Sequence, residues 1–475
     1  MALVSAGLRV PVALPPAGPR HAVAATPSSF PGAFVSTILF VPLPERGHIN
    51  PTFKMARALQ KRGHRIIYCS LRDTEEIIRA EGFDFECLFE SLFPKGFQAK
   101  NKARLGTLGG LARLGFLREL ALQQTRMLEA LLEGEFDALI ARTRPDLGII
   151  DVLLPEMSLV LHGHRVPAVV LNTSIPLRWE LMTPPPTSGL IPDGRLPNVV
   201  RGAVDWGRIV LDAKLGSLGS WVGLEPDAMK YRRALALKHG YPLSGLDFGG
   251  RLTGEHDPML IPCPREFVEF RGAKLSIDYH YTGPCIDLER QEPDFPWERL
   301  DAARPLVVCS LGTMVIQAEQ ARRFHRSIAQ AASRRPQWQF VVATNHWTEP
   351  LPGPVPENLV SVKHVPQLQM LRRASAMVTH GGFNSIKECI YFGVPMVVLP
   401  MQFDQPGMSA RVVHHGLGVR SAIEALTPDS LLQMLDEVLE KPSYRQKLGA
   451  MQTLFQAAEH EQALAESLEK HLRRA

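Results

Sequence analysis

The chain has 475 residues, 45% hydrophobic and 21% charged, a composition typical of a globular protein that is too long for one ordinary core. Its net charge of +5 comes without a basic run that contains aromatic residues, so nucleic acid is not an expected partner. No apolar run reaches the ~18 residues of a membrane span. The six cysteines form no CxxC pair, which indicates reduced thiols in a cytoplasmic protein and excludes a disulfide framework.

The first 34 residues are rich in alanine, proline and valine and contain no acidic residue. The prolines at 11, 15, 16 and 19 interrupt the apolar block that a secretory signal would need, so we expect residues 1–34 to be a disordered leader and not a secretory signal. An unbroken apolar run then predicts a buried strand at 36–42. A loop over 44–51, a helix over 52–62 and a second strand over 64–69 follow.

The same alternation of strand and helix continues and predicts a parallel, doubly wound α/β sheet. The further elements expected in this half are a helix at 73–81, a strand at 84–88, a helical stretch at 108–133, strands at 147–151 and 166–172, helices near 203–216 and 225–240, and a strand at 258–262. We assign this N-terminal domain to residues 35–283.

Residues 284–303, with Pro293, Pro296 and alternating charges, are predicted to be a linker. A second α/β domain is expected over 304–452. Its predicted elements are a strand at 305–312, a helix at 317–334, strands at 338–343 and 358–363, and a short helix at 367–373. Residues 453–475 form an amphipathic C-terminal helix whose expected packing partner is the N-terminal domain.

A glycine-rich turn is the most informative feature of the second domain. The strand Ala376-Met-Val leads into Thr379-His-Gly-Gly-Phe-Asn-Ser-Ile-Lys-Glu388, which begins a helix. Free N–H groups and the helix dipole at such a turn favour an anion such as phosphate. A second strand, Met396–Leu399, leads to Asp404-Gln405, a pair suited to vicinal hydroxyls. Together they suggest a nucleotide sugar, whereas a plain capping box at Ser385 and Glu388 is the structural alternative.

Between His364 and Gln405, including Val365-Pro-Gln367, the chain resembles the donor signature of the family 1 (UDP-glucuronosyl/UDP-glucosyl type) glycosyltransferases. The resemblance implies the glycosyltransferase B (GT-B) architecture, in which two Rossmann-like domains face each other across a cleft. It implies a UDP- or TDP-sugar as co-substrate, with UDP-glucose first, and no other cofactor. Tryptophan usually occupies the position of His364, and in plant relatives that of Phe383, so the contacts to the base and sugar are expected to differ here.

The resemblance also implies a role for each residue of the motif. The positions implied to bind the donor are Val365 at the base, Gln367 and Glu388 at the ribose, His380, Gly382, Asn384 and Ser385 at the diphosphate, and Asp404 and Gln405 at the sugar. Phe383 is a further donor-binding position, near the sugar. Ser310-Leu-Gly-Thr313 repeats the strand-to-turn pattern at the start of the second domain, so Ser310, Gly312 and Thr313 are further candidates for the diphosphate. The alternative is that this turn only caps the helix near 317.

His48 directly follows the first strand, and Asp151 ends another strand at the same edge of the predicted sheet. A histidine works as a general base near neutral pH when a buried carboxylate holds it in one tautomer. The resembled enzymes use a His–Asp dyad at both matching positions, which implies that His48 is the base and Asp151 orients it. The alternatives are that His48 caps the helix at 52–62 and that Asp151 caps a helix near 155–163.

The expected reaction is therefore transfer of a sugar to a hydroxyl with inversion and without a metal, since no acidic cluster adjoins the donor motif. A nucleotide-sugar 2-epimerase of the same architecture and a catalytically silent activator subunit are the alternatives. We expect a hydrophobic acceptor such as a polyketide, macrolide, carotenoid or flavonoid, and a monomer or weak homodimer. The apolar residues expected near the acceptor are Leu108, Leu111, Leu114, Phe116, Leu117, Trp179, Leu181 and Met182.

Overall fold

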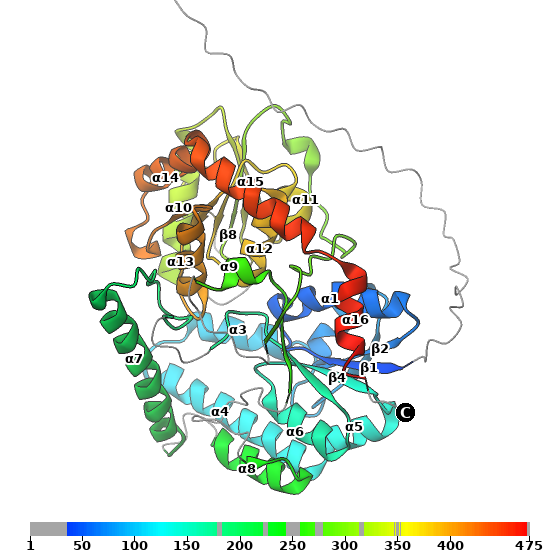
Figure 1. Ribbon diagram of the computed structural model, residues 1–475. Coiled ribbons are helices and arrows are strands. Elements are labelled where there is room, and N and C mark those ends of the chain that lie inside the picture. Colours follow the sequence, from blue (N-terminus) through cyan, green and yellow to red (C-terminus); the bar gives the residue numbers. More distant parts are fainter. Residues whose placement is uncertain are drawn as a thin grey trace, which may run out of the picture.

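The computed structural model describes residues 36–177, 183–221, 227–243, 257–270, 279–312, 318–345, 347, 351 and 353–472. The predicted leader at 1–34 lies outside these ranges. Two α/β domains are stacked in Figure 1, with the N-terminal half of the chain, in blue to green, below the yellow and orange C-terminal half. Among the described helices, none is long and apolar enough to cross a membrane.

The N-terminal domain is built on a parallel sheet of seven described strands in the order β3-β2-β1-β4-β5-β6-β7. The central strands carry unbroken apolar runs because helices cover both faces of the sheet. The strands are β1 (Thr37–Val41), β2 (Arg65–Ser70), β3 (Asp84–Cys87), β4 (Leu147–Asp151), β5 (Ala168–Leu171), β6 (Met259–Ile261) and β7 (Tyr279–Tyr281). The helices are α1 (Arg46–Lys61), α2 (Glu75–Ala80), α3 (Phe97–Thr107), α4 (Gly110–Glu133), α5 (Glu135–Thr143), α6 (Pro155–Gly163), α7 (Leu196–Trp221), α8 (Ala228–His239) and α9 (Arg265–Val268).

The C-terminal domain repeats this plan with six described parallel strands in the order β10-β9-β8-β11-β12-β13. Its strands are β8 (Leu306–Ser310), β9 (Gln339–Ala343), β10 (Leu359–Val362), β11 (Ala376–Thr379), β12 (Met396–Val398) and β13 (Gly418–Arg420). Its helices are α10 (Ala318–Ser333), α11 (Gln367–Leu371), α12 (Phe383–Phe392), α13 (Gln405–His415), α14 (Pro428–Glu440) and α15 (Pro442–Ala457), followed by α16 (Glu461–Glu469). Two doubly wound parallel sheets are the predicted fold class, which is confirmed.

The first helix differs from its prediction, because it begins at Arg46 and not near Thr52. A proline at position 51 suggested a loop, since proline removes one backbone donor from a helix. In the folded chain α1 accommodates Pro51 in its second turn. His48 therefore lies on a helix, in its first turn, and not in a loop.

The end of the chain also differs in detail from the prediction. The boundary placed at 452 falls inside α15, which continues to Ala457. Helix α16, red in Figure 1, lies against α1 of the N-terminal domain. Its apolar side enters the core there, and Glu469 accepts hydrogen bonds from Arg62 and is paired with His64.

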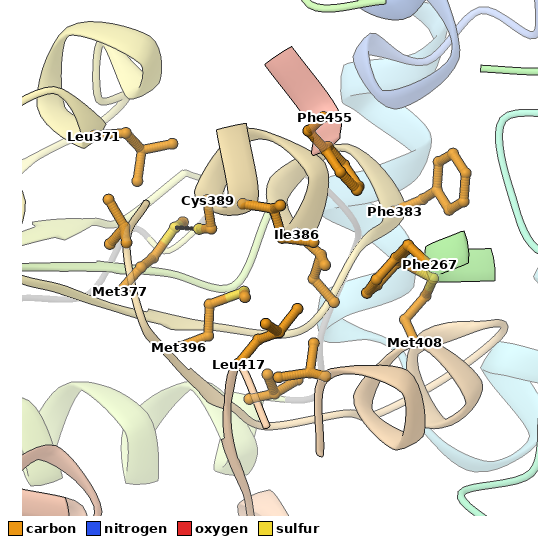
Figure 2. Packing of buried hydrophobic residues seen from close by; sticks show 14 of the residues in the cluster. Phe267, Leu371, Met377, Phe383, Ile386, Cys389, Met396, Met408, Leu417 and Phe455 are labelled. Atoms are coloured by element: carbon orange, nitrogen blue, oxygen red, sulfur yellow. Dashed lines mark hydrogen bonds between the residues drawn. The ribbon is translucent and has the colours of Figure 1, made fainter. Parts of the chain in front are cut away.

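A continuous apolar cluster joins the two domains. Figure 2 shows Phe267, from α9, packed among C-terminal residues that include Ile386 and Phe455. Two buried cations reinforce this contact. Lys387 donates to the carbonyls of Pro262 and Pro284, and Arg411 donates to the carbonyl of Val268. These bonds satisfy charges that would otherwise be costly to bury.

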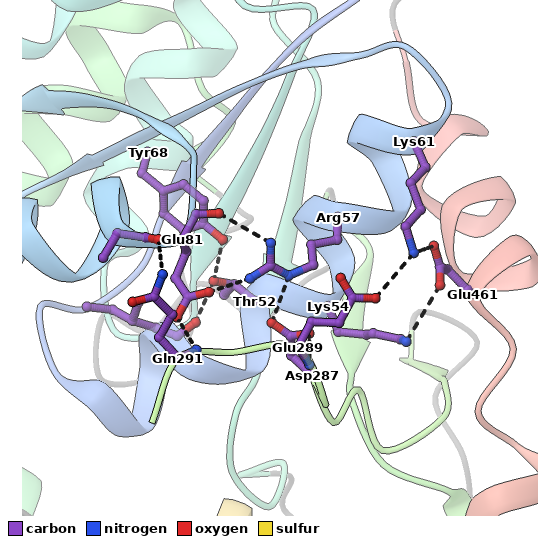
Figure 3. Close-up of polar contacts among 12 residues, drawn as sticks. Thr52, Lys54, Arg57, Lys61, Tyr68, Glu81, Asp287, Glu289, Gln291 and Glu461 are labelled. Atoms are coloured by element: carbon purple, nitrogen blue, oxygen red, sulfur yellow. Dashed lines mark hydrogen bonds and ion pairs between the residues drawn. The ribbon is translucent and has the colours of Figure 1, made fainter. Parts of the chain in front are cut away.

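The segment between the domains is fixed to the N-terminal domain by polar contacts (Figure 3). Arg57 of α1 donates to Asp287 over 3.0 Å and is paired with Glu81. Glu81 in turn accepts from the backbone of Gln291 over 2.8 Å. The predicted linker therefore runs as an ordered strap along α1 and α2.

Candidate active site

His48 and Asp151 are in direct contact at the carboxyl edge of the N-terminal sheet. The His48 Nδ1 atom lies 2.7 Å from Asp151 Oδ2 and 3.0 Å from the hydroxyl of Thr173. Strands β1 and β4 are neighbours in the sheet, so the residues that follow one strand meet the end of the other. His48 is held by one ring nitrogen, and its Nε2 makes no hydrogen bond within the described part of the chain.

Asp151 has the environment of an orienting carboxylate. Its side chain is fully buried, and its second oxygen accepts from the backbone N–H of Leu153 over 3.0 Å. The N-cap of α6 is Leu154, and no side chain caps that helix, so the alternative role of Asp151 as a helix cap is wrong. The capping alternative for His48 is also wrong, because α1 has Glu45 at its N-cap without a side-chain bond.

The protonation of His48 depends on the acids around it. Burial by itself would lower the pKa of His48, but the hydrogen bond and charge of Asp151 raise it. The carboxylates of Asp404 and Glu45 add to this effect, so the net pKa lies above the usual histidine value. A proton accepted at Nε2 would therefore be stabilised by three neighbouring carboxylates.

The N-terminus of α1 meets the glycine-rich turn of the other domain. The Asn384 side chain, in the first turn of α12, donates to the carbonyl oxygen of Gly47. This carbonyl is free because Pro51, four residues on, has no N–H to donate to it. A second bond across the domains joins the Ser174 hydroxyl to Asp404 over 2.8 Å. These contacts place His48 opposite the predicted donor motif.

The glycines of the two turns surround the ring of His380. A Cβ atom on Gly312 would lie 2.5 Å from His380 Cε1, and one on Gly382 would lie 2.5 Å from its Nε2. Gly312 also has a φ of +73°, which L-residues rarely adopt. Strands β8 and β11 pair side by side, which brings these turns together. Both glycines thus make room for the imidazole, a requirement that the sequence pattern did not reveal.

His380 is a neutral hydrogen-bonding group in this site. Burial lowers the pKa of His380 to about 4, against a smaller opposite effect from the backbone of Ser310. The imidazole therefore carries no charge at neutral pH. If it contacts a diphosphate, it does so as an N–H donor and not as a cation.

The helix that follows the turn is uncapped. Its N-cap is Gly382, and no side chain bonds to its first N–H groups. Ser385 lies at the third helical position, so the predicted alternative of a capping box starting at Ser385 is wrong. The Ser385 hydroxyl instead accepts from Gln367 Nε2 over 3.3 Å. An uncapped helix N-terminus with nearby hydroxyl and amide groups suits a diphosphate.

Glu388 is buried and already has partners on both oxygens. Arg290 Nη1 donates to one oxygen over 2.6 Å, and Gln367 Nε2 donates to the other. Gln367 itself is the first residue of α11, directly after Val365 and Pro366. The residues implied to bind the ribose, Gln367 and Glu388, are therefore brought together. Their side chains bond to each other, and Glu388 also bonds to Arg290.

Asp404 and Gln405 lie at the start of α13. Gln405 is buried, and its Oε1 accepts from the backbone of Met401 over 2.9 Å and of Gln402 over 3.1 Å, which fixes the loop. Burial raises the pKa of Asp404, although the hydrogen bond from Ser174 acts against this. The Gln405 side chain thus fixes its own loop, and the Asp404 side chain bonds to Ser174 of the other domain.

Two predicted donor residues need separate comment. Phe383 is buried in the cluster between the domains, with Lys387 Nζ 4.8 Å from its ring centre, so its side chain is not available to the donor. Apolar packing at the first helical position outcompetes a surface role there, and only its backbone N–H faces the helix end. Thr313 lies outside the described residues. Ser310 is buried, and its hydroxyl accepts from Gly312 N.

His364, which replaces the usual tryptophan, is part of a small polar network. Its Nδ1 lies 3.3 Å from Asn345 Oδ1, and Asn345 Nδ2 donates to the carbonyl of Gly312 over 2.6 Å. Val365 is half-buried and packs against the apolar cluster. The network links the expected base-binding segment to the turn after β8.

Four residues of the site were missed from the sequence: Thr173, Ser174, Arg290 and Asn345. A signal existed for the first two, because they follow a buried strand at the same edge as Asp151. Arg290 lies in a segment of mixed charge, where nothing in the local pattern distinguishes it. Asn345 adopts a positive φ of 49°, which only the structure reveals.

The expected acceptor side is only partly described. Leu111 is 86% exposed and Leu114 is 46% exposed on α4, whereas Phe116 is buried under the guanidinium of Arg104. The residues of this set that lie outside the described ranges are Trp179, Leu181 and Met182. An apolar surface therefore remains uncovered on α4.

Known proteins resemble this chain along much of its length. Residues 290–461 match the family described as UDP-glucoronosyl and UDP-glucosyl transferase. The chain is 24% identical to NDP-glycosyltransferase YjiC of Bacillus licheniformis over 451 residues, 90% of this chain and 96% of that protein. It is 27% identical to demethyllactenocin mycarosyltransferase of Streptomyces fradiae over 417 residues, 87% of this chain and 82% of that protein.

The fold has solved counterparts. The crystal structure of the glycotransferase of kitacinnamycin superposes with a TM-score of 0.67 at 23% identity, covering 92% of this chain and all of that one. The two parallel α/β domains are therefore the GT-B architecture. The family model matches the C-terminal part of the chain and the glycosyltransferase relatives span most of it, so the chain is similar to the family 1 glycosyltransferases, enzymes that transfer a sugar from a nucleotide sugar to an acceptor.

Proposed function

We propose that this enzyme transfers glucose from UDP-glucose to a hydroxyl of an apolar small molecule, with inversion at the anomeric carbon. His48 is the general base. One observation carries the proposal: His48 is fixed through Nδ1 by the buried Asp151, while Nε2 is open at the point where α1 meets the donor turn. Glucose is chosen because Gln405 matches the family's glucose-associated position.

The reaction follows from this geometry. With Nδ1–H donated to Asp151, the lone pair on His48 Nε2 accepts the proton of the acceptor hydroxyl. The acceptor oxygen forms a bond to the anomeric carbon as the bond from that carbon to the diphosphate oxygen breaks. Attack from the face opposite the leaving group converts an α-linked donor into a β-glycoside. UDP leaves with the bonding electron pair.

The leaving diphosphate gains negative charge, which the donor turn can stabilise. The uncapped N-terminus of α12 offers backbone N–H groups and the positive end of its dipole. Neutral His380 offers one further N–H. The proposal therefore assigns no step to a metal ion.

Removal of divalent metals is expected to leave the rate of transfer unchanged. Backbone donors cannot be chelated, so the stabilisation of the diphosphate should survive. The check is the initial rate of the purified enzyme after dialysis against excess EDTA, compared with the same enzyme given Mg²⁺ or Mn²⁺. A rate that falls in EDTA and returns with either metal contradicts the proposal.

Gly312→Ala is expected to weaken donor binding by about tenfold or more, because its Cβ would displace the His380 ring. The matched control is Gly63→Ala. Gly63 has a similar φ of +89° but nothing within 4 Å of an added Cβ. Both variants should lose about 1 kcal/mol of stability from the positive φ. Calorimetric titration with UDP measures the loss of donor affinity, and melting curves measure the loss of stability. Equal UDP affinity in both variants would show that the His380 ring is not needed.

The exposed leucines of α4 support an apolar acceptor. The direct test is incubation of the purified chain with UDP-glucose and a panel of apolar aglycones, read by mass spectrometry for the addition of a hexose. A glycosylated product separates this function from both alternatives. Conversion of the nucleotide sugar to its C2 epimer would indicate an epimerase. Binding of nucleotide without either product would indicate a silent subunit.

A further inference from the structure

Arg290 lies between the domains at the centre of a buried polar network. Its side chain is only 10% exposed, and the two carboxylates that it pairs with, Glu388 and Glu292, are each 5% exposed. The guanidinium donates to Glu388 over 2.6 Å and to Glu292 over 3.3 Å. A buried ion pair of this kind is costly to form and contributes little net stability, so its placement calls for a reason beyond stability.

The network connects the parts of the expected donor pocket. Glu292 accepts the backbone N–H groups of Leu368 and Gln369 over 2.8 and 3.0 Å, which fixes the start of α11. This helix begins with Gln367, whose side chain reaches Glu388 and Ser385. One arginine therefore sets the position of α11 and of the carboxylate on α12 at once.

The neighbours of Arg290 along the chain are held by the other domain. Asp287 and Gln291 bond to Arg57 and Glu81 of the N-terminal domain, whereas Arg290 and Glu292 bond to the C-terminal domain. The strap thus alternates between the two domains from one residue to the next. Arg57 lies on α1, the helix that also carries His48.

We infer that Arg290 is a positioning residue for the nucleotide sugar, which acts by holding the Glu388 carboxylate oriented toward the ribose hydroxyls. This inference rests on the proposed function, since it takes Glu388 as the group that binds the ribose. Each Glu388 oxygen has one partner in the structure, and a carboxylate oxygen can accept two hydrogen bonds. One lone pair on each oxygen thus remains for a ribose hydroxyl.

If Arg290 acts in this way, it should affect how well the enzyme distinguishes UDP from 2′-deoxy-UDP. UDP and 2′-deoxy-UDP differ only in the 2′-hydroxyl, one of the two ribose hydroxyls that Glu388 would accept from. The wild-type enzyme should bind UDP about tenfold more tightly than 2′-deoxy-UDP, as expected for a hydrogen bond to a charged group. Arg290→Gln should lose most of this preference, because the binding of UDP weakens about tenfold more than the binding of 2′-deoxy-UDP, which keeps only the 3′-hydroxyl as a partner for Glu388.

The experiment is calorimetric titration of the full chain with the two nucleotides, with melting curves of every variant. Arg335→Gln is the matched control, because Arg335 pairs with Asp436 on the outside of the same domain. It should keep the full preference for UDP. In steady-state assays, Arg290→Gln should raise the KM for UDP-glucose and leave kcat within about twofold, since His48 is not touched.

A double variant guards against a purely structural effect. Arg290→Gln leaves two buried carboxylates without their cation, whereas Arg290→Gln with Glu388→Gln removes one of them. The double variant should bind both nucleotides with the affinities of the Glu388→Gln variant. If Arg290→Gln does not fold, Arg290→Lys replaces it, and this variant should retain part of the preference for UDP over 2′-deoxy-UDP.

Two results would overturn the inference. One is a wild-type enzyme that binds UDP and 2′-deoxy-UDP equally, and the other is an Arg290→Gln variant that loses affinity for both to the same extent. A wild-type enzyme that binds neither nucleotide would instead refute the proposed function itself.

Discussion

His48→Ala is expected to reduce kcat by about 10³-fold, the range typical for loss of a general base. Alanine at this position leaves no group to accept the proton of the acceptor hydroxyl. UDP affinity should remain within about twofold of wild type, because the donor turn lies on the other domain. Single-turnover transfer assays and calorimetric titration with UDP measure the two quantities separately.

His460→Ala is the control for this variant. His460 is exposed and precedes α16, so its loss should change neither quantity. Transfer at the wild-type rate by the His48→Ala enzyme would remove His48 from the mechanism. A loss of UDP binding that matches the loss of rate would instead mean that the imidazole holds the donor.

Asp151→Asn is expected to lower kcat by roughly 10²-fold or more and to move the acid limb of the pH profile to lower pH. The carboxylate raises the pKa of His48 above its usual ~6.5. His48 must be neutral to accept a proton, so the wild-type rate is lost as the pH falls through this raised pKa. Without the charge of Asp151, burial lowers the pKa and the remaining activity should persist at more acidic pH. An amide can also stabilise the wrong tautomer by donating to Nδ1.

Asp146→Asn provides the comparison for this variant. Asp146 lies just before the opposite end of β4 and accepts from the backbone of Thr37 over 2.8 Å, remote from the edge that carries His48. Its pH profile should coincide with that of the wild-type enzyme. An Asp151→Asn profile with an unmoved acid limb would show that a group other than His48 controls the rate at low pH.

The linear pattern of the sequence was enough to predict the two parallel sheets. Parallel strands are buried on both faces, so they occur as short continuous apolar runs that can be recognised one at a time, as at 147–151. The ends of such strands meet at one edge of the sheet. That rule alone placed His48 and Asp151 together, although 103 positions separate them.

The sequence pattern was less informative where the usual local preference of a residue is overridden by a contact with a distant segment. Pro51 suggested a loop, and α1 nevertheless includes it, because the carbonyl that it leaves unpaired is bound by Asn384 from the other domain. Phe383 occupies a donor position in the motif, but the apolar contact between the domains buries its ring. Neither partner is near in the sequence.

The chain alone therefore indicates the candidate residues for binding a phosphate, a sugar and a proton, since these depend on side-chain type and on spacing along one element. How the two domains meet was decided by tertiary packing. The room that Gly312 and Gly382 leave for His380, and the strap that joins Arg290 to Glu388, depend on contacts between segments many residues apart. Such contacts have no periodic signature, because the energy of each one is set by the shape and charge of whatever the fold brings next to it.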